Sequence, residues 1–180
     1  ARAALDAGAT CFTHLYNAMS PMLNRAPGVV GAAIASDAYA GIICDGIHVD
    51  DAMVAIALRA RPVADRMFLV SDAMPTVGGP DVFDLYGQRI RLHNGCLINE
   101  EGSLAGAHVT QAQGVARLVQ HVGVSLEQAL RMAITVPADL IDAPAMAQIV
   151  GRHIDDLVTM DDALDLTGVG LRLDAHDQAS

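Results

Sequence analysis

Three short apolar runs of the sequence each end in side chains that can hold a metal or move a proton. The runs CFTHLYNAM, GIICDGIHVD and MFLVSDAM carry His14, then Asp45 with His48, then Asp72. A carboxylate directly after a buried strand is costly unless it is paired, bound to a metal or placed at the strand mouth. A divalent metal on an imidazole lowers the pKa of a bound water to about 7, and a free carboxylate nearby can take the proton of that water. We therefore interpret His14 as a metal ligand and Asp72 as a general acid/base.

Each feature has a simpler interpretation when it is taken alone. A histidine in an apolar strand is often a hydrogen-bonded core residue, an aspartate after a strand can cap a helix, and Asp45-Gly46 can be a turn. The catalytic interpretation is favoured because all three features fall at the same end of successive strands. Alternation along CFTHLY would also place Phe12, His14 and Tyr16 on one face of the first strand.

The spacing of the three runs predicts parallel strands joined by helices. Strands are expected over three ranges: 9–15, 40–44 and 67–71. A helix is expected over 49–60, capped by Asp50 or Asp51 and ended by Pro62. Helical crossovers place successive strands in parallel, and in a parallel α/β barrel the carboxyl ends of all strands open onto the face where active sites lie.

The other segments show shorter helix and strand patterns. Further helices are expected over three segments, 2–7, 110–122 and 125–134, and VVGAAIAS is expected to form a short helix or a turn. Ser125 with Gln128 is typical of a capping box, and Asn94-Gly95 within the alternating segment 83–98 predicts a hairpin. LVTM and VGLRLDA near the end of the chain predict two short strands that do not fit the alternation of strands and helices in a barrel. His108 is expected to be a peripheral surface residue.

Composition and charge narrow the classes of partner. The chain has 180 residues, of which 52% are apolar and only 3% aromatic, and this suits helices packed on a buried parallel sheet. A formal net charge of -10 argues against a nucleic-acid partner. No stretch approaches the ~20 apolar residues of a membrane span, so no membrane partner is expected. The three cysteines share no CxxC spacing, which fits a reduced, cytoplasmic protein.

Five ordered motifs point to one family. They are THLYNAM, NRAPG followed by VVGAA, CDGIHVD, LVSDAM and GSLAGA. In this order and spacing they resemble the N-acetylglucosamine-6-phosphate deacetylases of the amidohydrolase superfamily, and the segment SLEQALRMAITVPADLI is similar to the same family. The chain begins ARAALDAGAT, a helix end that runs into a strand, so we expect it to be the C-terminal part of a longer protein.

The resemblance implies a role for each matching residue. His14 matches a metal-ligand histidine, and Asp72 matches the catalytic general acid/base. Arg25 and His48 match residues that hold the substrate phosphate, a task that suits a planar guanidinium. The other substrate-binding positions that the resemblance implies are Asn17, Ala18, Asp45, Gly46, Ile47, Leu104, Ala105 and Gly106.

The resemblance also implies an architecture and partners. The fold class would be α/β, with residues 1–145 forming the C-terminal part (strands six to eight and the following helices) of a metal-dependent hydrolase TIM barrel. A hairpin insertion would lie near 83–103, and 146–180 would supply strands of a small accessory β-domain and the tail. The cofactor would be a divalent metal ion, zinc first, with iron or another divalent ion as the alternative. The family's other ligands, a Glu and a His, would lie upstream, so these residues alone should be inactive. The substrate would be an amino-sugar phosphate and the assembly a homodimer.

Two other functions stay open at the level of the sequence. The same histidine and aspartate could serve another amidohydrolase, a deaminase or cyclic amidase, on a substrate without phosphate. The chain could also be a non-catalytic fragment that binds a sugar phosphate without turnover.

Overall fold

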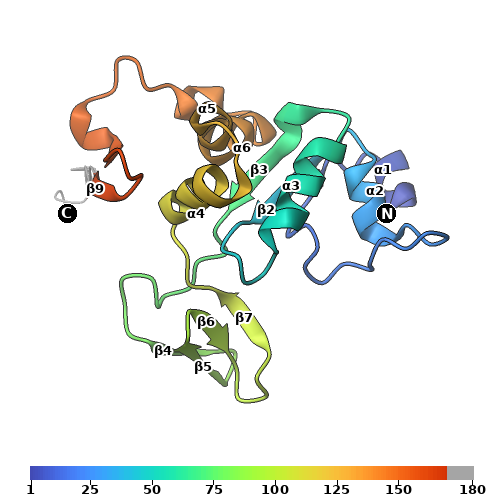
Figure 1. The fold of residues 1–180 in the computed structure, drawn as a ribbon, viewed down its shortest axis with the longest axis horizontal. Helices are drawn as coiled ribbons and strands as arrows, with labels where there is room; N and C mark the ends of the chain where they lie inside the picture. Colours follow the sequence, from blue (N-terminus) through green and yellow to red (C-terminus); the bar gives the residue numbers. More distant parts are fainter. Residues whose placement is uncertain (170–180) are drawn as a thin grey trace, which may run out of the picture.

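A three-stranded parallel sheet forms the centre of the structure, a computed structural model that describes residues 1–169 (Figure 1). Its strands lie in the order β1 (Cys11–Phe12), β2 (Tyr39–Ile43) and β3 (Met67–Val70). Both pairings are parallel, with Cys11 opposite Tyr39 and Ala40 opposite Met67. The α/β class and the parallel strands are therefore confirmed, and the carboxyl ends of the three strands share one edge of the sheet.

Helices cover this sheet and complete its core. Those that precede β3 are α1 (Arg2–Asp6), α2 (Gly28–Ile34), α3 (Asp51–Ala60) and a 3-10 turn at Ala64–Arg66. The Asp50 carboxylate accepts a hydrogen bond from the Ala52 N–H at 2.8 Å, so Asp50 is the predicted cap of α3. Ile42, Val54 and Met67 are fully buried in one apolar cluster that joins the sheet to the surrounding helices.

The first strand is shorter than the sequence predicts. We expected a strand over 9–15, and the structure has one only at Cys11–Phe12. His14, Tyr16 and Ala18 have φ angles of 58°, 76° and 53°. This left-handed backbone cannot continue a strand. The predicted alternation is therefore wrong, and His14 lies on a turn beyond the strand.

A four-stranded antiparallel sheet follows β3 and lies below the parallel sheet in Figure 1. Its strands are β4 (Val82–Leu85), β5 (Gln88–His93), β6 (Cys96–Ile98) and β7 (Leu104–Ala107). The hairpin at Asn94–Gly95 is confirmed, but the prediction missed a second two-residue turn at Tyr86–Gly87 and the strand β7. Both turns have positive φ at both residues, the geometry that matches the twist of a tight hairpin.

The C-terminal helices pack against β3. They are α4 (Gln111–Arg117) with a π-helical turn at Leu118–Val122, α5 (Leu126–Leu130), a π-helical turn at Arg131–Thr135, and α6 (Val136–Leu140). Ser125 caps α5 by accepting from the Gln128 N–H at 3.2 Å, but the reciprocal capping box is found at Thr110 and Gln113. The second helical segment continues to Leu140, beyond the predicted end at 134.

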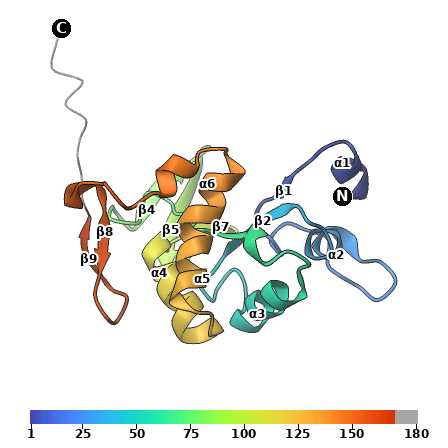
Figure 2. The same ribbon diagram turned by 90° about the horizontal axis from the view of Figure 1, so that it is seen from above.

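A short hairpin lies beyond α4 (Figure 2). Two 3-10 turns, Pro144–Ala147 and Ile154–Asp156, lead to β8 (Val158–Met160), which pairs with β9 (Leu166–Val169). The predicted strand LVTM is confirmed. The predicted strand VGLRLDA overlaps β9 only at Val169, because its other residues lie outside the described part of the chain. No helix within residues 1–169 is long and apolar enough to cross a bilayer.

Candidate active site

The side chains of His14 and Asp72 meet at the carboxyl edge of the parallel sheet. Nε2 of His14 lies 3.6 Å from Oδ1 of Asp72, and the two side chains are 41% and 33% exposed. Nδ1 of His14 lies 2.7 Å from the hydroxyl oxygen of Thr13. A hydrogen bond at one ring nitrogen orients a metal-binding histidine and leaves the other nitrogen for the metal. The ring is therefore held with Nε2 toward Asp72.

Backbone hydrogen bonds fix the turn that carries His14. Leu15 is fully buried, and its N–H donates to the carbonyl of Gly41 in β2 at 2.8 Å. The Asn17 N–H closes the turn by donating to the His14 carbonyl at 2.8 Å. Asn17 and Ala18, two of the predicted substrate-binding residues, therefore lie beside the candidate metal ligand.

Strand β7 holds the backbone of Asp72. The Ala107 N–H donates to the Asp72 carbonyl at 2.9 Å, and the Met74 N–H donates to the Ala107 carbonyl at 3.1 Å. Gly106 has a φ of 79°, and a Cβ there would overlap the Met74 side chain. These contacts use only the backbone of Asp72. They bring the predicted segment 104–106 next to the candidate acid/base.

Asp45 and His48 form a nearly buried pair after β2. Oδ2 of Asp45 lies 2.7 Å from Nδ1 of His48, and the side chains are 6% and 7% exposed. Oδ1 of Asp45 accepts from the N–H groups of Ile47 and His48, both at 2.9 Å. Burial raises the pKa of Asp45, but the hydrogen bonds from His48 and Ile47 outweigh it, and the pKa lies below its ordinary value. Since an ionised carboxylate only accepts, a proton of His48 lies on Nδ1, and the contact with Asp45 does not use Nε2.

Asp45→Asn is expected to destabilise the chain near neutral pH and to matter less in acid. Because the folded pKa is lowered, the ionised Asp45 stabilises the fold above the unfolded value of 3.8. That contribution is lost as the pH falls through the lower folded value. At pH 6 the free energy of unfolding should fall by about 1–2 kcal/mol in the variant. Urea titrations of both chains at pH 6 and pH 3 measure this difference, and a difference of equal size at both pH values would contradict the expectation.

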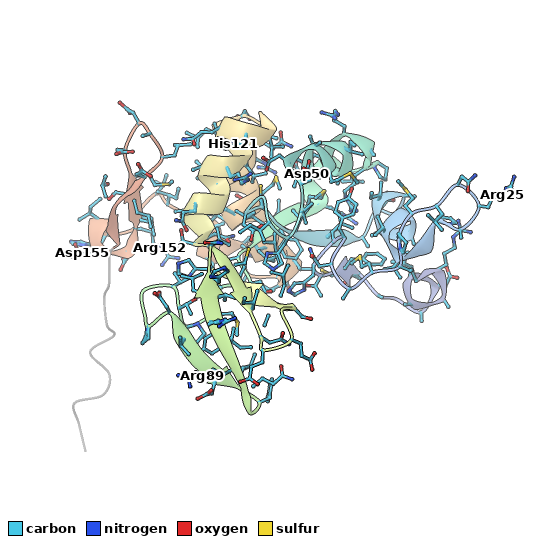
Figure 3. The ribbon with its side chains drawn as sticks, turned by 60° about the horizontal axis from the view of Figure 1, so that its bottom comes forward. Arg25, Asp50, Arg89, His121, Arg152 and Asp155 are labelled. Atoms are coloured by element: carbon cyan, nitrogen blue, oxygen red, sulfur yellow. The ribbon has the colours of Figure 1, made fainter. Side chains whose placement is uncertain are left out.

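Arg25 lies away from these side chains. It is exposed at the tip of the loop between β1 and α2, whereas Asp50, two residues after His48, lies over the middle of the molecule (Figure 3). The structure therefore does not bring Arg25 to His48.

Two side chains near the loop 45–48 were missed by sequence analysis. His108, expected at the surface, is half-buried, and its Nδ1 lies 2.9 Å from the hydroxyl of the buried Thr76. Arg117, at the end of α4, pairs with Asp51. No local pattern marks either contact, because the partners are 32 and 66 residues apart in the chain.

Cys44, which directly precedes the loop Asp45–His48, does not act as a nucleophile. Cys44 is buried, and burial with the nearby Asp51 carboxylate raises its pKa to about 12. The thiol, not the reactive thiolate, is the form at neutral pH. Cys44 is a small apolar side chain of the core.

Comparison with known proteins decides the family. No family model matches the chain. The N-acetylglucosamine-6-phosphate deacetylase of Haemophilus influenzae is 37% identical over 145 residues, which make up 78% of this chain and 38% of that protein. A putative N-acetylgalactosamine-6-phosphate deacetylase of Escherichia coli (strain K12) is 34% identical over 130 residues, 71% of this chain and 77% of that protein. The chain belongs to the N-acetylglucosamine-6-phosphate deacetylase family.

The fold supports membership of this deacetylase family. The crystal structure of N-acetylglucosamine-6-phosphate deacetylase from Pasteurella multocida superposes with a TM-score of 0.84 at 34% identity, over 92% of this chain and 44% of that one. The chain therefore spans about two fifths of the length of the Haemophilus and Pasteurella deacetylases.

The deacetylase family is generally metal-dependent, and the side chains present fit one part of a metal site. Within residues 1–169, no group of three or more His, Cys, Asp or Glu side chains gathers. His14 presents Nε2, and the Asp72 carboxylate lies 3.6 Å from it. Because catalytic zinc sites use about three protein ligands, this part of the chain supplies only a fraction of the set.

Proposed function

We propose that this chain is part of an enzyme that hydrolyses N-acetylglucosamine 6-phosphate to glucosamine 6-phosphate and acetate. The main support is the approach of His14 Nε2 to Asp72 Oδ1, at 3.6 Å, on the edge of the sheet where parallel α/β enzymes place their active sites. The relatives are named for N-acetylglucosamine and N-acetylgalactosamine 6-phosphates, so an amino-sugar phosphate is the substrate class.

The three parallel strands would be strands six, seven and eight of a TIM barrel. Neighbouring strands lie about 4.8 Å apart, so β1 and β3 are separated by about 10 Å across β2. The contact between His14 and Asp72, which follow these two outer strands, supports a sheet curved toward their side, as in a barrel. Residues 1–145 would form this part of the barrel with its insertion near 83–103, and 146–180 would belong to the accessory domain.

Asp72 would carry out the proton transfers. When bound, a divalent metal ion, zinc first and iron as the alternative, supplies Lewis acidity to such a site. Asp72 accepts a proton from the water that attacks the acetamide carbonyl. It then gives that proton to the departing amine as the C–N bond breaks. The hydrogen bond from the Ala107 N–H fixes the backbone from which the Asp72 side chain extends.

The substrate would be held from several sides. His48 would bind the phosphate through Nε2, because Nδ1 is occupied by Asp45. Arg25 lies away from His48 in this chain, so its contact with the same phosphate is proposed from the family resemblance alone. The remaining positions proposed to line the sugar or shape its loop are Asn17, Ala18, Asp45, Gly46, Ile47, Leu104, Ala105 and Gly106.

The assembly and compartment are also proposals. A homodimer follows from the family resemblance. A reducing, cytoplasmic setting is supported by the cysteines Cys11, Cys44 and Cys96, all of which are free.

The proposed function is tested by adding to this chain the part of a related deacetylase that it does not cover. In a chimeric enzyme, which we call the joined enzyme, this chain replaces the matching segment of the Haemophilus influenzae deacetylase. We expect it to release acetate from N-acetylglucosamine 6-phosphate faster than from N-acetylgalactosamine 6-phosphate or unphosphorylated N-acetylglucosamine. A soluble, metal-loaded joined enzyme that hydrolyses none of the three would refute the proposal.

Arg25→Ala in the joined enzyme is expected to weaken binding of the phosphorylated sugar. Loss of a charge-assisted phosphate contact should raise KM about tenfold or more. Turnover of unphosphorylated N-acetylglucosamine should stay unchanged, since it lacks the group that Arg25 would hold. Steady-state kinetics on both sugars measures the effect, and equal losses on both would remove Arg25 from phosphate binding.

A further inference from the structure

We propose that Arg117 is a positioning residue that holds the loop Asp45–His48 in the form in which His48 faces the substrate. The inference rests on the proposed role of His48 in phosphate binding. Its geometric part, that Arg117 fixes the loop, stands on contacts of the described residues alone.

Arg117 makes a two-point contact with the start of α3. Its Nε donates to Oδ1 of Asp51 and its Nη2 donates to Oδ2, each at 2.8 Å. The side chains of Arg117 and Asp51 are 30% and 26% exposed, so the pair is partly shielded from water. The hydrogen bond to Asp51 raises the pKa of Arg117, consistent with a fixed guanidinium. A planar fork held at two points has little freedom to move.

The same guanidinium lies directly against the loop. A Cβ built on Gly46 would overlap the terminal nitrogen and central carbon of the Arg117 guanidinium. Gly46 also has a φ of 74°, so both the backbone conformation and the space call for glycine. Gly46 is therefore packed against the Arg117 guanidinium, whose position Asp51 fixes.

Asp45 makes the contacts within the loop. Its carboxylate accepts from the backbone N–H groups of Ile47 and His48 and contacts the His48 ring. This contact orients the ring relative to the loop but does not tie the loop to another element. Arg117 supplies that tie, because it comes from α4 and also contacts the first residue of α3. Without it, the loop could move as a unit and carry His48 with it.

A second pair in the chain provides a matched control. Arg131 donates to the two carboxylate oxygens of Asp65 through Nε at 3.3 Å and Nη2 at 3.0 Å. This pair also joins residues that are 66 positions apart, but it is more exposed and lies at Asp65, outside the loop 45–48. A general effect of losing one arginine–aspartate pair would appear in both arginine variants. A positioning effect would appear only at Arg117.

The first experiment measures amide hydrogen exchange in the 180-residue chain. Arg117→Met should speed exchange of the Ile47 and His48 amides about tenfold, since loosening the loop exposes both bonds to Asp45. The Ile42 amide in β2 should exchange as in the parent chain, which shows that the fold is intact. Arg117→Lys should give an intermediate rate, and Arg131→Met should leave both loop amides unchanged. Parent-like exchange at both amides in Arg117→Met, or equal acceleration at Ile42, would overturn the inference.

The second experiment uses the joined enzyme. Arg117→Met should raise KM for N-acetylglucosamine 6-phosphate about tenfold, while kcat stays within about twofold, because the affected group would bind the distant phosphate. Arg117→Lys should recover part of the loss, and Arg131→Met should match the parent. A fall in kcat with unchanged KM would overturn the assigned role. An inactive parent joined enzyme would instead refute the proposed function, and the exchange rates would still decide whether Arg117 holds the loop.

Discussion

Replacing Asp72 with Asn should lower the rate of acetate release by the joined enzyme about 10²–10⁴-fold. The amide is close in size to the carboxylate but cannot take a proton from water and pass it to the leaving amine. The contact that fixes Asp72 is made by its carbonyl, which accepts from the Ala107 N–H and is retained in the variant. The fold and the backbone at residue 72 should therefore survive, so the loss would report on proton transfer.

The matched control for Asp72→Asn is Asp84→Asn. Asp84 is an exposed aspartate in β4 of the antiparallel sheet, and its replacement should leave the rate unchanged. Steady-state acetate release and metal content should be measured on the parent and both variants. An Asp72→Asn enzyme that keeps its activity would remove Asp72 from the mechanism, whereas lost metal would make it a ligand.

Arg61→Met should lower the free energy of unfolding of the chain by about 3 kcal/mol. Arg61 follows α3 directly and is only 6% exposed. Its guanidinium donates to the carbonyl of Ala33 at 2.6 Å and to the carbonyl of Ala38, at and beyond the end of α2. Burial lowers the pKa of Arg61, which reflects the cost of placing its charge there. Methionine keeps the apolar stem but removes the guanidinium from both carbonyls, and of the two only the Ala33 carbonyl still accepts a hydrogen bond within the described residues, from the Ser36 hydroxyl at 3.0 Å.

The control for Arg61 is its neighbour Arg66. Arg66 donates to the Asp37 carbonyl at 2.7 Å and lies 5.3 Å from the centre of the Tyr39 ring, but it is half-exposed. Water can replace its hydrogen bond, so Arg66→Met should cost less than about 1 kcal/mol. Urea titration at pH 7 measures both variants. Equal losses of unfolding free energy in the two variants would show that the burial of Arg61 does not strengthen its contribution to stability.

Local signals predicted much of the scaffold. The buried run of β2, the cap Asp50 and the Asn94–Gly95 turn were all found where the sequence indicated. Each depends on residues within a few positions of one another, and such preferences act in any tertiary context. The turn at Tyr86–Gly87 was missed because tyrosine rarely adopts a positive φ, here 50°.

The residues after β1 show where local signals fail. CFTHLY has the composition of a strand, yet the backbone turns at His14 with a φ of 58°. The buried Leu15 and its hydrogen bond to the Gly41 carbonyl hold this turn against β2. That partner lies in another strand, so no window of sequence around His14 could reveal it.

The amino-acid order alone therefore set the chemistry of the candidate site: which residues carry imidazole, carboxylate and guanidinium groups, and which of them follow a strand. It also set the pair of Asp45 and His48, since the two residues are only three positions apart in the chain. Folding in three dimensions settled the distances between groups far apart in the chain. It brought His14 to Asp72, set Arg117 against Gly46 and left Arg25 on a distant loop. Such distances depend on how helices and strands pack, a sum of many weak contacts that no single segment encodes.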